Sequence, residues 1–260
     1  MKNFILFGIA VLSFFGSFAQ KIKNEKKAQK QQKIRNMVRE EEEGIISYKK
    51  QFVFGAHLST DGYGIMGEFG KFSSVKKSML FQLDIGEKKD AKEDKSYGTK
   101  SIQPYIYGKQ NFVYPIKLGV QLQTLLGNKS NKNGVSISAN YGGGLSIALL
   151  RPYMVQIVNS TNELEYIKYS PQDSATFLDE GAVVKGPQFG TGWNQMTVKP
   201  GAYAKAAIRF DYGAYNETVS ALEAGIMGEI YSGKIPIMVN NPAKQFFFTG
   251  YVTILFGRRK

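Results

Sequence analysis

The stretch Gln245-Phe-Phe-Phe-Thr-Gly-Tyr-Val-Thr-Ile-Leu-Phe256 decides the fold class. A β-strand points successive side chains to opposite faces, so this stretch has one apolar face and one face with hydroxyl groups at its centre. The apolar face carries Phe246, Phe248, Val252, Ile254 and Phe256, and the other carries Thr249, Tyr251 and Thr253. After its N-terminal segment the chain has no long apolar helix to cover that apolar face. The face is therefore expected to meet lipid, as in the closing strand of a membrane barrel.

The same alternation recurs from about residue 51 onward. Its clearest example runs from Val135 to Ile147, where apolar residues oppose Ser, Asn and Gly. The dipeptide Asp61-Gly62 between two such runs is a strong hairpin signal. The pattern predicts an all-β fold, a transmembrane antiparallel barrel of about ten strands over residues 51–260, and eight or twelve strands also fit. Two of the runs that are counted as barrel strands are 102–109 and 152–158.

Long connections are expected on the outer side of such a barrel and short turns on the inner side. This rule assigns to the outer side the connections 87–101, 127–133, 159–199 and 231–244. It assigns to the inner side the turns 72–77, 110–114, 149–151 and 213–218. The connection 159–199, which contains Trp193, is the expected capping or ligand-contact loop.

The N-terminus has the composition of a secretion signal. Lys2 precedes an apolar run from Phe4 to Phe15, and cleavage is expected after Ala19, so residues 1–19 are predicted to be a signal peptide. Residues 20–50 hold ten Lys or Arg against five Glu and are predicted to form a charged periplasmic helix or arm. The chain has no Cys, which excludes a disulfide framework and a lipidated N-terminal cysteine.

The formal net charge of +13 would fit a nucleic-acid partner. An exported chain has no ready access to nucleic acid, however, and the basic residues fall largely in turns, loops and the N-terminal arm. We therefore predict that no nucleic acid binds, and that outer-membrane lipid and lipopolysaccharide supply the counter-charge.

Several segments resemble a family of small outer-membrane β-barrel proteins that is common in Bacteroidota. They are the run Tyr141 to Tyr153, the segments His57 to Tyr63 and Tyr107 to Asn111, and the ending from Ile235 to Lys260. The resemblance covers most of residues 51–260, and its motifs are turns and strands. It implies an integral outer-membrane barrel and transfers no active site.

The interior face of the predicted strands is rich in charge. Opposite charges are expected to pair across the lumen and fill it, because a barrel of this size is narrow enough for side chains to close it. The alternative is a small solute pore lined by the same groups. The predicted lumen residues are His57, Glu68, Asp84, Lys117, Lys205, Arg209, Asp211, Glu223 and Glu229.

One pair of residues raises the question of an enzyme. His57, the only histidine, and Ser59 lie on one strand face with Glu68 nearby, and they resemble the His-x-Ser pair of outer-membrane lipid A deacylases. In that chemistry the imidazole takes the serine proton and the alkoxide attacks an acyl ester. The alternation places the pair toward the lumen, whereas a deacylase must present it to acyl chains outside. These three residues remain weak candidates, and an interior hydrogen-bonded histidine is the favoured interpretation.

Neither a cofactor nor a metal is expected. The run Gly62-Tyr-Gly-Ile-Met-Gly67 matches a dinucleotide-binding fingerprint, but a strand pattern follows it where that fingerprint needs a helix. One His and no Cys cannot build a zinc or copper site.

Aromatic residues cluster near the predicted strand ends, where an interfacial girdle is expected. The predicted girdle contains Tyr105, Tyr107, Phe112, Tyr114, Tyr153, Tyr203, Tyr212, Tyr215, Tyr231 and Tyr251. The favoured function is a non-enzymatic structural or accessory barrel, a subunit of a larger outer-membrane assembly with another outer-membrane or periplasmic protein as partner. Within the closing strand, Phe248, Val252, Ile254 and Phe256 are the expected assembly signal.

Overall fold

The protein is described here from a computed structural model. The described residues are 29, 31–32, 35, 50–72, 77–97, 103–129, 134–159, 161–213 and 217–260. The chain divides into two units, Met1–Tyr48 and Lys49–Lys260. The signal peptide predicted over 1–19 lies outside the described residues, as does nearly all of the helix or arm predicted over 20–50, and both stay predictions.

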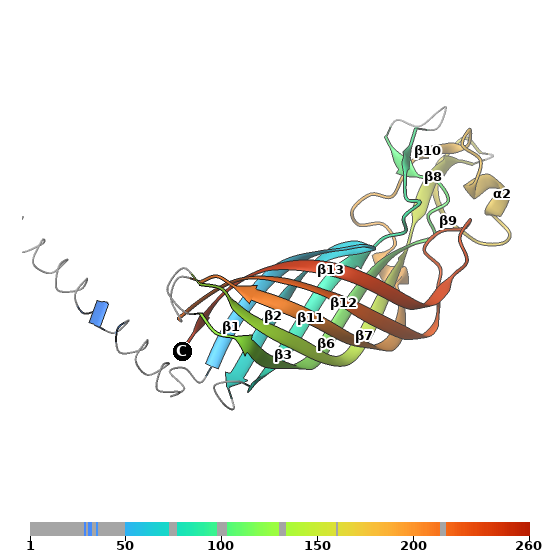
Figure 1. Cartoon of the computed structure of the whole chain (residues 1–260). Coiled ribbons are helices and arrows are strands. Elements are labelled where there is room, and N and C mark those ends of the chain that lie inside the picture. Colours follow the sequence, from blue (N-terminus) through green and yellow to red (C-terminus); the bar gives the residue numbers. More distant parts are fainter. Residues whose placement is uncertain are drawn as a thin grey trace, which may run out of the picture. The chain divides into compact units, whose positions relative to one another are not determined.

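Eight antiparallel strands close into a barrel in the order β1-β13-β12-β11-β7-β6-β3-β2 (Figure 1). The first strand pairs with the last, from Gln51 opposite Arg259 to Ser59 opposite Tyr251, so the sheet has no free edge. The strands are β1 (Lys50–Ser59), β2 (Gly62–Phe72), β3 (Lys77–Lys88), β6 (Asn111–Gly127), β7 (Ser136–Pro152), β11 (Thr197–Asp211), β12 (Thr218–Ile235) and β13 (Lys244–Arg259). The antiparallel barrel is confirmed, and the expected count of ten strands is wrong.

Two predicted barrel strands belong instead to small sheets outside the barrel. The run 102–109 contains β5 (Tyr105–Ile106), which pairs with β4 (Lys95–Ser96), and the run 152–158 contains β8 (Met154–Val158). The central strand β8 pairs with β9 (Leu164–Lys168) and β10 (Val183–Lys185). Two short helices complete this region, α2 (Ser174–Phe177) and η1 (Trp193–Gln195).

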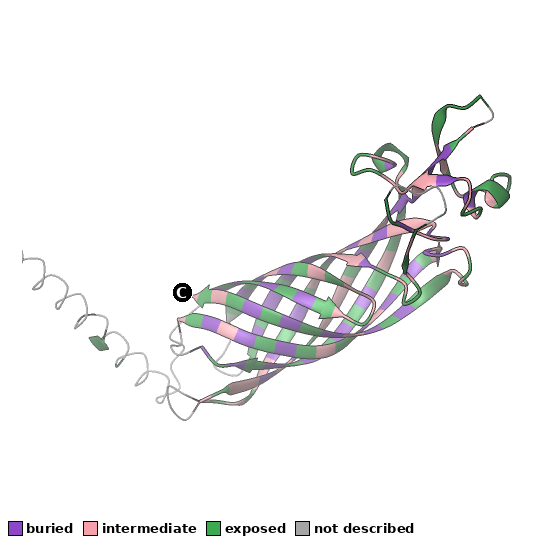
Figure 2. Ribbon diagram, turned by 90° about the horizontal axis from the view of Figure 1, so that it is seen from above, coloured by how far each residue is buried: buried purple, intermediate pink, exposed green. Residues whose placement is uncertain are grey.

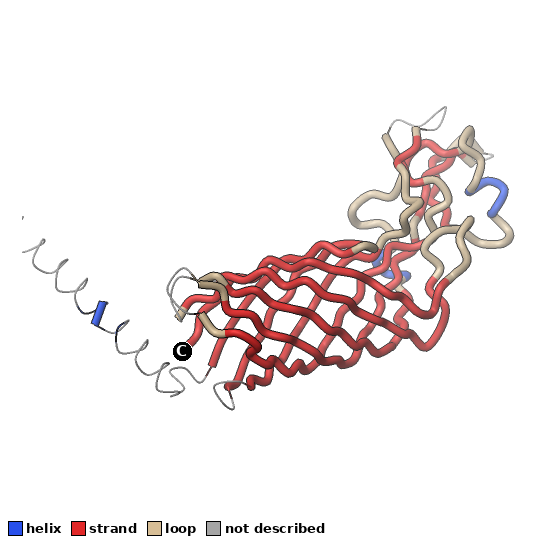
Figure 3. The backbone as a smooth tube through the Cα atoms, viewed as in Figure 1, coloured by secondary structure: helices blue, strands red, loops and turns tan. Residues whose placement is uncertain are grey.

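Because these two runs are not barrel strands, one of the connections lies at a different end of the barrel than predicted. Residues 111–114 and 149–151 of the predicted inner turns are parts of β6 and β7, which are 17 residues long each. The connection after β6 consequently lies at the same end as the connections after β2 and β11, not on the opposite side as predicted. We call this the terminus end, because β1 begins and β13 ends there, and the opposite end the loop end (Figure 3).

Side chains alternate between the lumen and the outer wall along every strand, as the sequence predicted. Figure 2 shows exposed and buried residues alternating along the strands. In β1, Phe52, Phe54 and Leu58 are 61%, 58% and 72% exposed, whereas Val53 and His57 between them are buried. The outward positions of the other strands are apolar too. On β13, ten residue steps from Phe246 to Phe256 at about 3.4 Å each, tilted by about 40°, give an apolar band of about 25 Å.

At the loop end, a second hydrophobic core holds the small sheets together. It contains Tyr105, Tyr153, Val155, Ile157, Phe177 and Val183. The hydroxyl oxygen of Tyr153 accepts a hydrogen bond from the backbone N–H of Ile106 at 2.8 Å, and burial raises the pKa of Tyr153 to about 12. This region is therefore a packed subdomain on the end of the barrel. Of the described residues, no helix is long and apolar enough to cross a membrane.

Candidate functional site: a filled lumen

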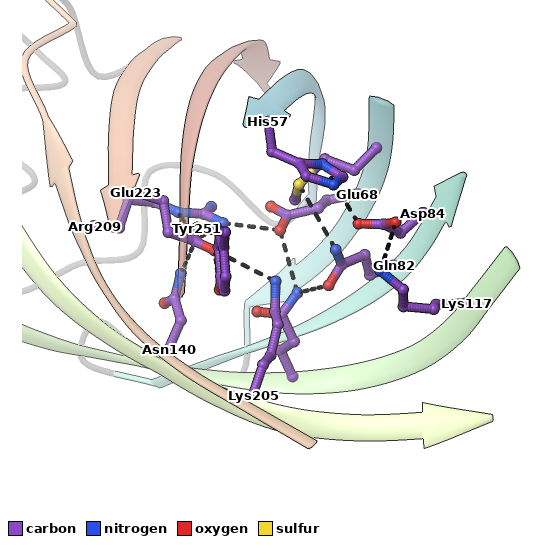
Figure 4. A network of polar contacts seen from close by, with 12 residues as sticks. His57, Glu68, Gln82, Asp84, Lys117, Asn140, Lys205, Arg209, Glu223 and Tyr251 are labelled. Carbon is purple, nitrogen blue, oxygen red and sulfur yellow. Dashed lines mark hydrogen bonds and ion pairs between the residues drawn. The ribbon is translucent and has the colours of Figure 1, made fainter. Parts of the chain in front are cut away.

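The structure places all nine predicted lumen residues inside the barrel. Each is at most 7% exposed, and six strands contribute them: β1, β2, β3, β6, β11 and β12. Figure 4 labels all of them except Asp211 and Glu229. Eight of the nine belong to two adjacent polar groups in the middle of the lumen, which together we call the network, and among the described residues no hydrogen bond or ion pair joins one group to the other. The ninth, Asp211, pairs separately at the terminus end, where Arg259 donates to it at 2.6 Å and Lys129 lies 3.6 Å away.

Arg209 is the centre of the first half of the network. Its Nη2 donates to Glu223 Oε2 at 2.6 Å and to Glu68 Oε1 at 2.8 Å, and its Nε donates to Glu223 Oε2 at 2.9 Å. Glu223 also accepts hydrogen bonds from Asn140, at 2.8 Å, and from the Tyr251 hydroxyl, at 3.0 Å. Charge-assisted bonds of this kind are about twice as strong as neutral ones, so one guanidinium ties β11, β12 and β2 together across the lumen.

Lys117 is the centre of the second half. Its Nζ lies 3.2 Å from Asp84 Oδ1 and 3.4 Å from Glu229 Oε1. Glu229 also pairs with Lys88 at 3.4 Å and accepts a hydrogen bond from the Tyr231 hydroxyl at 2.7 Å. All of these groups face one another across the interior, so each buried charge has an opposite charge within reach.

Glutamine side chains extend the first half of the network toward β3. Gln121 Nε2 donates to Glu68 Oε1 at 3.2 Å and to Gln82 Oε1, whose own amide nitrogen contacts the sulfur of Met66 at 3.7 Å. Gln121 is completely buried. A buried polar group costs free energy unless it is hydrogen-bonded, and this pair of amides extends the hydrogen bonding between β2, β3 and β6.

Apart from Asp61, a partly exposed carboxylate at the loop end that also pairs with Lys88, the network balances its charges. Its cations are Lys88, Lys117, Lys205 and Arg209, and its carboxylates are Glu68, Asp84, Glu223 and Glu229. Every one of these eight side chains is at most 6% exposed. Burying an unpaired charge is very costly, so equal numbers of each sign, in contact, are what a filled interior requires.

Apolar clusters close the lumen at both ends of the network. At the loop end, Val113, Ala148, Leu150, Tyr231, Ile235 and Phe247 pack together with Ile237 and Met238 from the connection between β12 and β13. At the terminus end, Val53, Met66, Val219, Ala221 and Leu255 form a second cluster. The interior of the barrel is thus packed along its length.

Asp61 links the hairpin of β1 and β2 to two other strands of the barrel. Its carboxylate accepts hydrogen bonds from Lys88 and, at 3.0 Å, from Thr249. This one side chain therefore joins the loop between β1 and β2 to β3 and β13.

We expect Asp61→Ala to lower the free energy of unfolding by about 1–3 kcal/mol, because it leaves the buried Lys88 with fewer partners. Asp61→Asn should cost less, since an amide oxygen still accepts from Thr249. Urea unfolding in phosphatidylcholine vesicles, followed by the migration of unheated samples on gels, measures both. Equal costs for the two variants would contradict this role.

The weak catalytic candidates do not form a catalytic arrangement. The carboxylate that approaches His57 is Asp84, with Oδ2 at 3.7 Å from Nδ1, whereas Glu68 is bonded to Arg209 and Gln121. Within the described part of the chain, no side-chain hydrogen bond joins Ser59 to His57. The imidazole is buried inside the barrel, 7% exposed, and no described group of three or more His, Asp and Glu is placed to hold a metal ion.

The prediction that these ten aromatic residues form an interfacial girdle is partly wrong. Tyr105 and Tyr153 are buried in the subdomain at the loop end and Tyr107 packs against its core, because the runs that contain them are not barrel strands. The lumen positions Tyr203, Tyr231 and Tyr251 are also buried. Tyr215 lies outside the described residues. The outward members are Phe112, Tyr114 and Tyr212.

Sequence reasoning missed several members of the network. Lys88 was assigned to a loop, although it ends β3 in phase with Asp84. Gln121 and Tyr251 were assigned to the inner face by the alternation, which was the signal that could have included them. The partners of these residues depend on which strands lie across the lumen, and no local pattern carries that information.

Comparisons with known proteins show resemblance in fold only. No protein-family model matches the chain, and no curated protein matches it. The crystal structure of Ail, the attachment invasion locus protein of Yersinia pestis, in complex with the heparin analogue sucrose octasulfate, is 8% identical, with a TM-score of 0.39. That match covers 83% of this chain and 100% of the Ail chain. Neisserial surface protein A (NspA) is 8% identical over 82% of this chain and 96% of its own, with a TM-score of 0.36. No ligand or partner transfers from either to this chain.

Proposed function

We propose that this chain is an integral outer-membrane β-barrel protein with a closed lumen and a non-enzymatic, structural or accessory role. The observation that carries the proposal is the inverted arrangement of the barrel, with an apolar outer wall around a charged interior. A water-soluble barrel has the opposite arrangement, whereas lipid-facing strands alternate apolar-out and polar-in. The signal peptide predicted over residues 1–19 agrees with export.

The orientation follows from the lengths of the connections. The loop end carries the subdomain built on β8, β9 and β10, and the terminus end carries short connections and both ends of the barrel. Outer-membrane barrels keep short turns on the periplasmic side. We place the subdomain outside the cell, and the arm predicted over residues 20–50 in the periplasm.

In this proposal the lumen does not conduct. We expect the purified protein to give no single-channel steps in planar phosphatidylcholine bilayers, even at high salt, because paired charges and two apolar clusters fill the interior. A general porin in the same chamber provides the positive control. Reproducible steps that grow with salt concentration would contradict the closed lumen and favour the solute pore.

The accessory role adds a partner, contacted by the loop-end subdomain or by the N-terminal arm. A mild-detergent pull-down of the tagged mature protein from outer membranes tests it, with deletion of residues 20–48 as the comparison. Stoichiometric co-elution of another envelope protein supports the role, and its loss on deletion assigns the contact to the arm. Elution as a lone monomer contradicts the subunit role and leaves the membrane location standing.

A further inference from the structure

The connection from β10 to β11 returns to the barrel and lies against its outer wall. We call residues 186–196 the rim loop; they include η1. The Trp193 indole stacks on the ring of Tyr114, with centroids 6.1 Å apart and planes 8° apart. Tyr114 lies on the outer face of β6, which it shares with Phe112 and with the apolar side chains that follow it along the strand. The rim loop therefore covers the outside of the wall, not the mouth of the lumen.

Arg151 of β7 fixes the loop in this position. Its guanidinium lies 4.1 Å from the ring centre of Phe112 and 5.0 Å from that of Trp193. Its Nη1 donates to the backbone carbonyl of Phe189 at 3.2 Å, and the Trp193 indole N–H donates to the same carbonyl at 2.7 Å. Cation–π contacts are stronger when they are shielded from water, and Arg151 is only 6% exposed.

The backbone of the loop is shaped for this close approach. Gly192 has a φ of 83°, in the left-handed region that glycine adopts without strain. A Cβ at this position would lie 2.9 Å from the carbonyl oxygen of Pro152. The loop exposes the rings of Phe189 and Trp193 together with the polar side chains of Gln188, Asn194 and Gln195.

Those rings are exposed next to the apolar wall. Phe189 is 91% exposed and Trp193 is 44% exposed. The neighbouring outward position Val198 of β11 is 56% exposed, and Ile147 and Leu145 of β7 are 40% and 70% exposed. The exposed rings thus continue the apolar band of the barrel at its loop end. Amphipathic aromatic side chains in such a position occupy the boundary between headgroups and acyl chains.

We propose that the rim loop is an interfacial anchor, which inserts the Phe189 ring into the outer leaflet of the membrane beside the barrel. The inference rests on the proposed membrane location and names lipid as the occupant of this surface. A sugar-binding platform needs an open ring face, and Tyr114 already covers one face of Trp193. By holding β6 and β7 at a fixed depth, the anchor sets the height of the subdomain above the lipid.

The sequence allows a direct test, because Trp193 is the only tryptophan of the chain. The full mature protein is folded into phosphatidylcholine vesicles with acyl chains brominated near the headgroup, and into unbrominated vesicles. We expect brominated lipid to quench Trp193 and aqueous iodide to quench it weakly. Phe189→Ser should abolish most of the lipid quenching and increase quenching by iodide. Strong iodide quenching of the unaltered protein without lipid quenching would overturn the proposal.

Two controls separate this inference from the membrane location. Tyr97→Ser removes an aromatic ring that is 73% exposed in the connection between β3 and β6, and it should change neither kind of quenching. The chain has no Cys, so Phe248→Cys takes a single bimane label on the wall of β13. Lipid quenching of this label without quenching of Trp193 overturns only the rim-loop anchor. Absence of both refutes the membrane location as well.

Discussion

Replacing Arg209 by Met is expected to lower the free energy of unfolding by about 3–5 kcal/mol, because removing one partner leaves buried carboxylates without their counter-charge. Arg209 is 1% exposed and makes three hydrogen bonds, two to Glu223 and one to Glu68. Methionine keeps much of the volume and removes the charge. Urea unfolding in phosphatidylcholine vesicles, read from the fluorescence of Trp193 and from gel migration, provides the measurement.

Two further variants show whether charge or packing is responsible. The double variant Arg209→Met with Glu68→Gln should be more stable than Arg209→Met alone, because it removes a carboxylate that has lost its partner. Arg258→Gln breaks an ion pair of 3.9 Å whose arginine is 69% exposed, and it should change the free energy of unfolding by less than about 1 kcal/mol. If the double variant had a lower free energy of unfolding than Arg209→Met alone, the electrostatic account would be refuted.

Ile226→Arg is expected to lower the free energy of unfolding in a bilayer by about 2–4 kcal/mol, the cost of an arginine on the lipid face at the bilayer midplane. Ile226 lies in the middle of β12, 51% exposed on the outer wall, opposite Gly250 of β13. In water such an exposed substitution would be nearly neutral, since an arginine would be solvated there. The size of the effect therefore reports the medium around the wall.

Tyr212→Arg is the matched control. Tyr212 directly follows β11 at the terminus end and is 50% exposed, so an arginine there reaches the interface and should cost about 0–1 kcal/mol. The two variants are compared by urea titration in the same vesicles. Equal effects at both positions would mean that the cost of an arginine does not depend on its depth along the outer wall. The membrane proposal would then fail.

The faces of the strands were predictable from the sequence, but their number was not. Alternation assigns Phe52 and Phe54 to one face and His57 to the other without any knowledge of the partner strands. The same alternation in Tyr153, Val155 and Ile157 belongs to a small sheet, where the apolar face meets Phe177 and Val183 instead of lipid. A local pattern shows that a face is apolar and does not show what covers it.

The contacts of the lumen network were likewise only partly predictable from the sequence. Asp84 opposite Lys117, and Arg209 opposite Glu223, are register partners on neighbouring strands, so a correct pairing of strands gives them. The contact of Arg209 with Glu68 crosses the lumen from β11 to β2. It depends on how the closed barrel curves, which follows from the strand number that the sequence left open.

The charges in the lumen also constrain the route by which this barrel can be assembled. Before β1 meets β13, the sheet is open, and Arg209, Lys117 and their carboxylate partners lie on a bare face. A charge exposed at the centre of a bilayer costs about 2.5–3.5 kcal/mol even on insertion-based scales. An open sheet that enters lipid strand by strand would bear that cost many times over. On the proposed membrane location, the seam between the first and last strands is consequently expected to form before insertion or together with it, so for this sequence the barrel closes no later than it crosses the membrane.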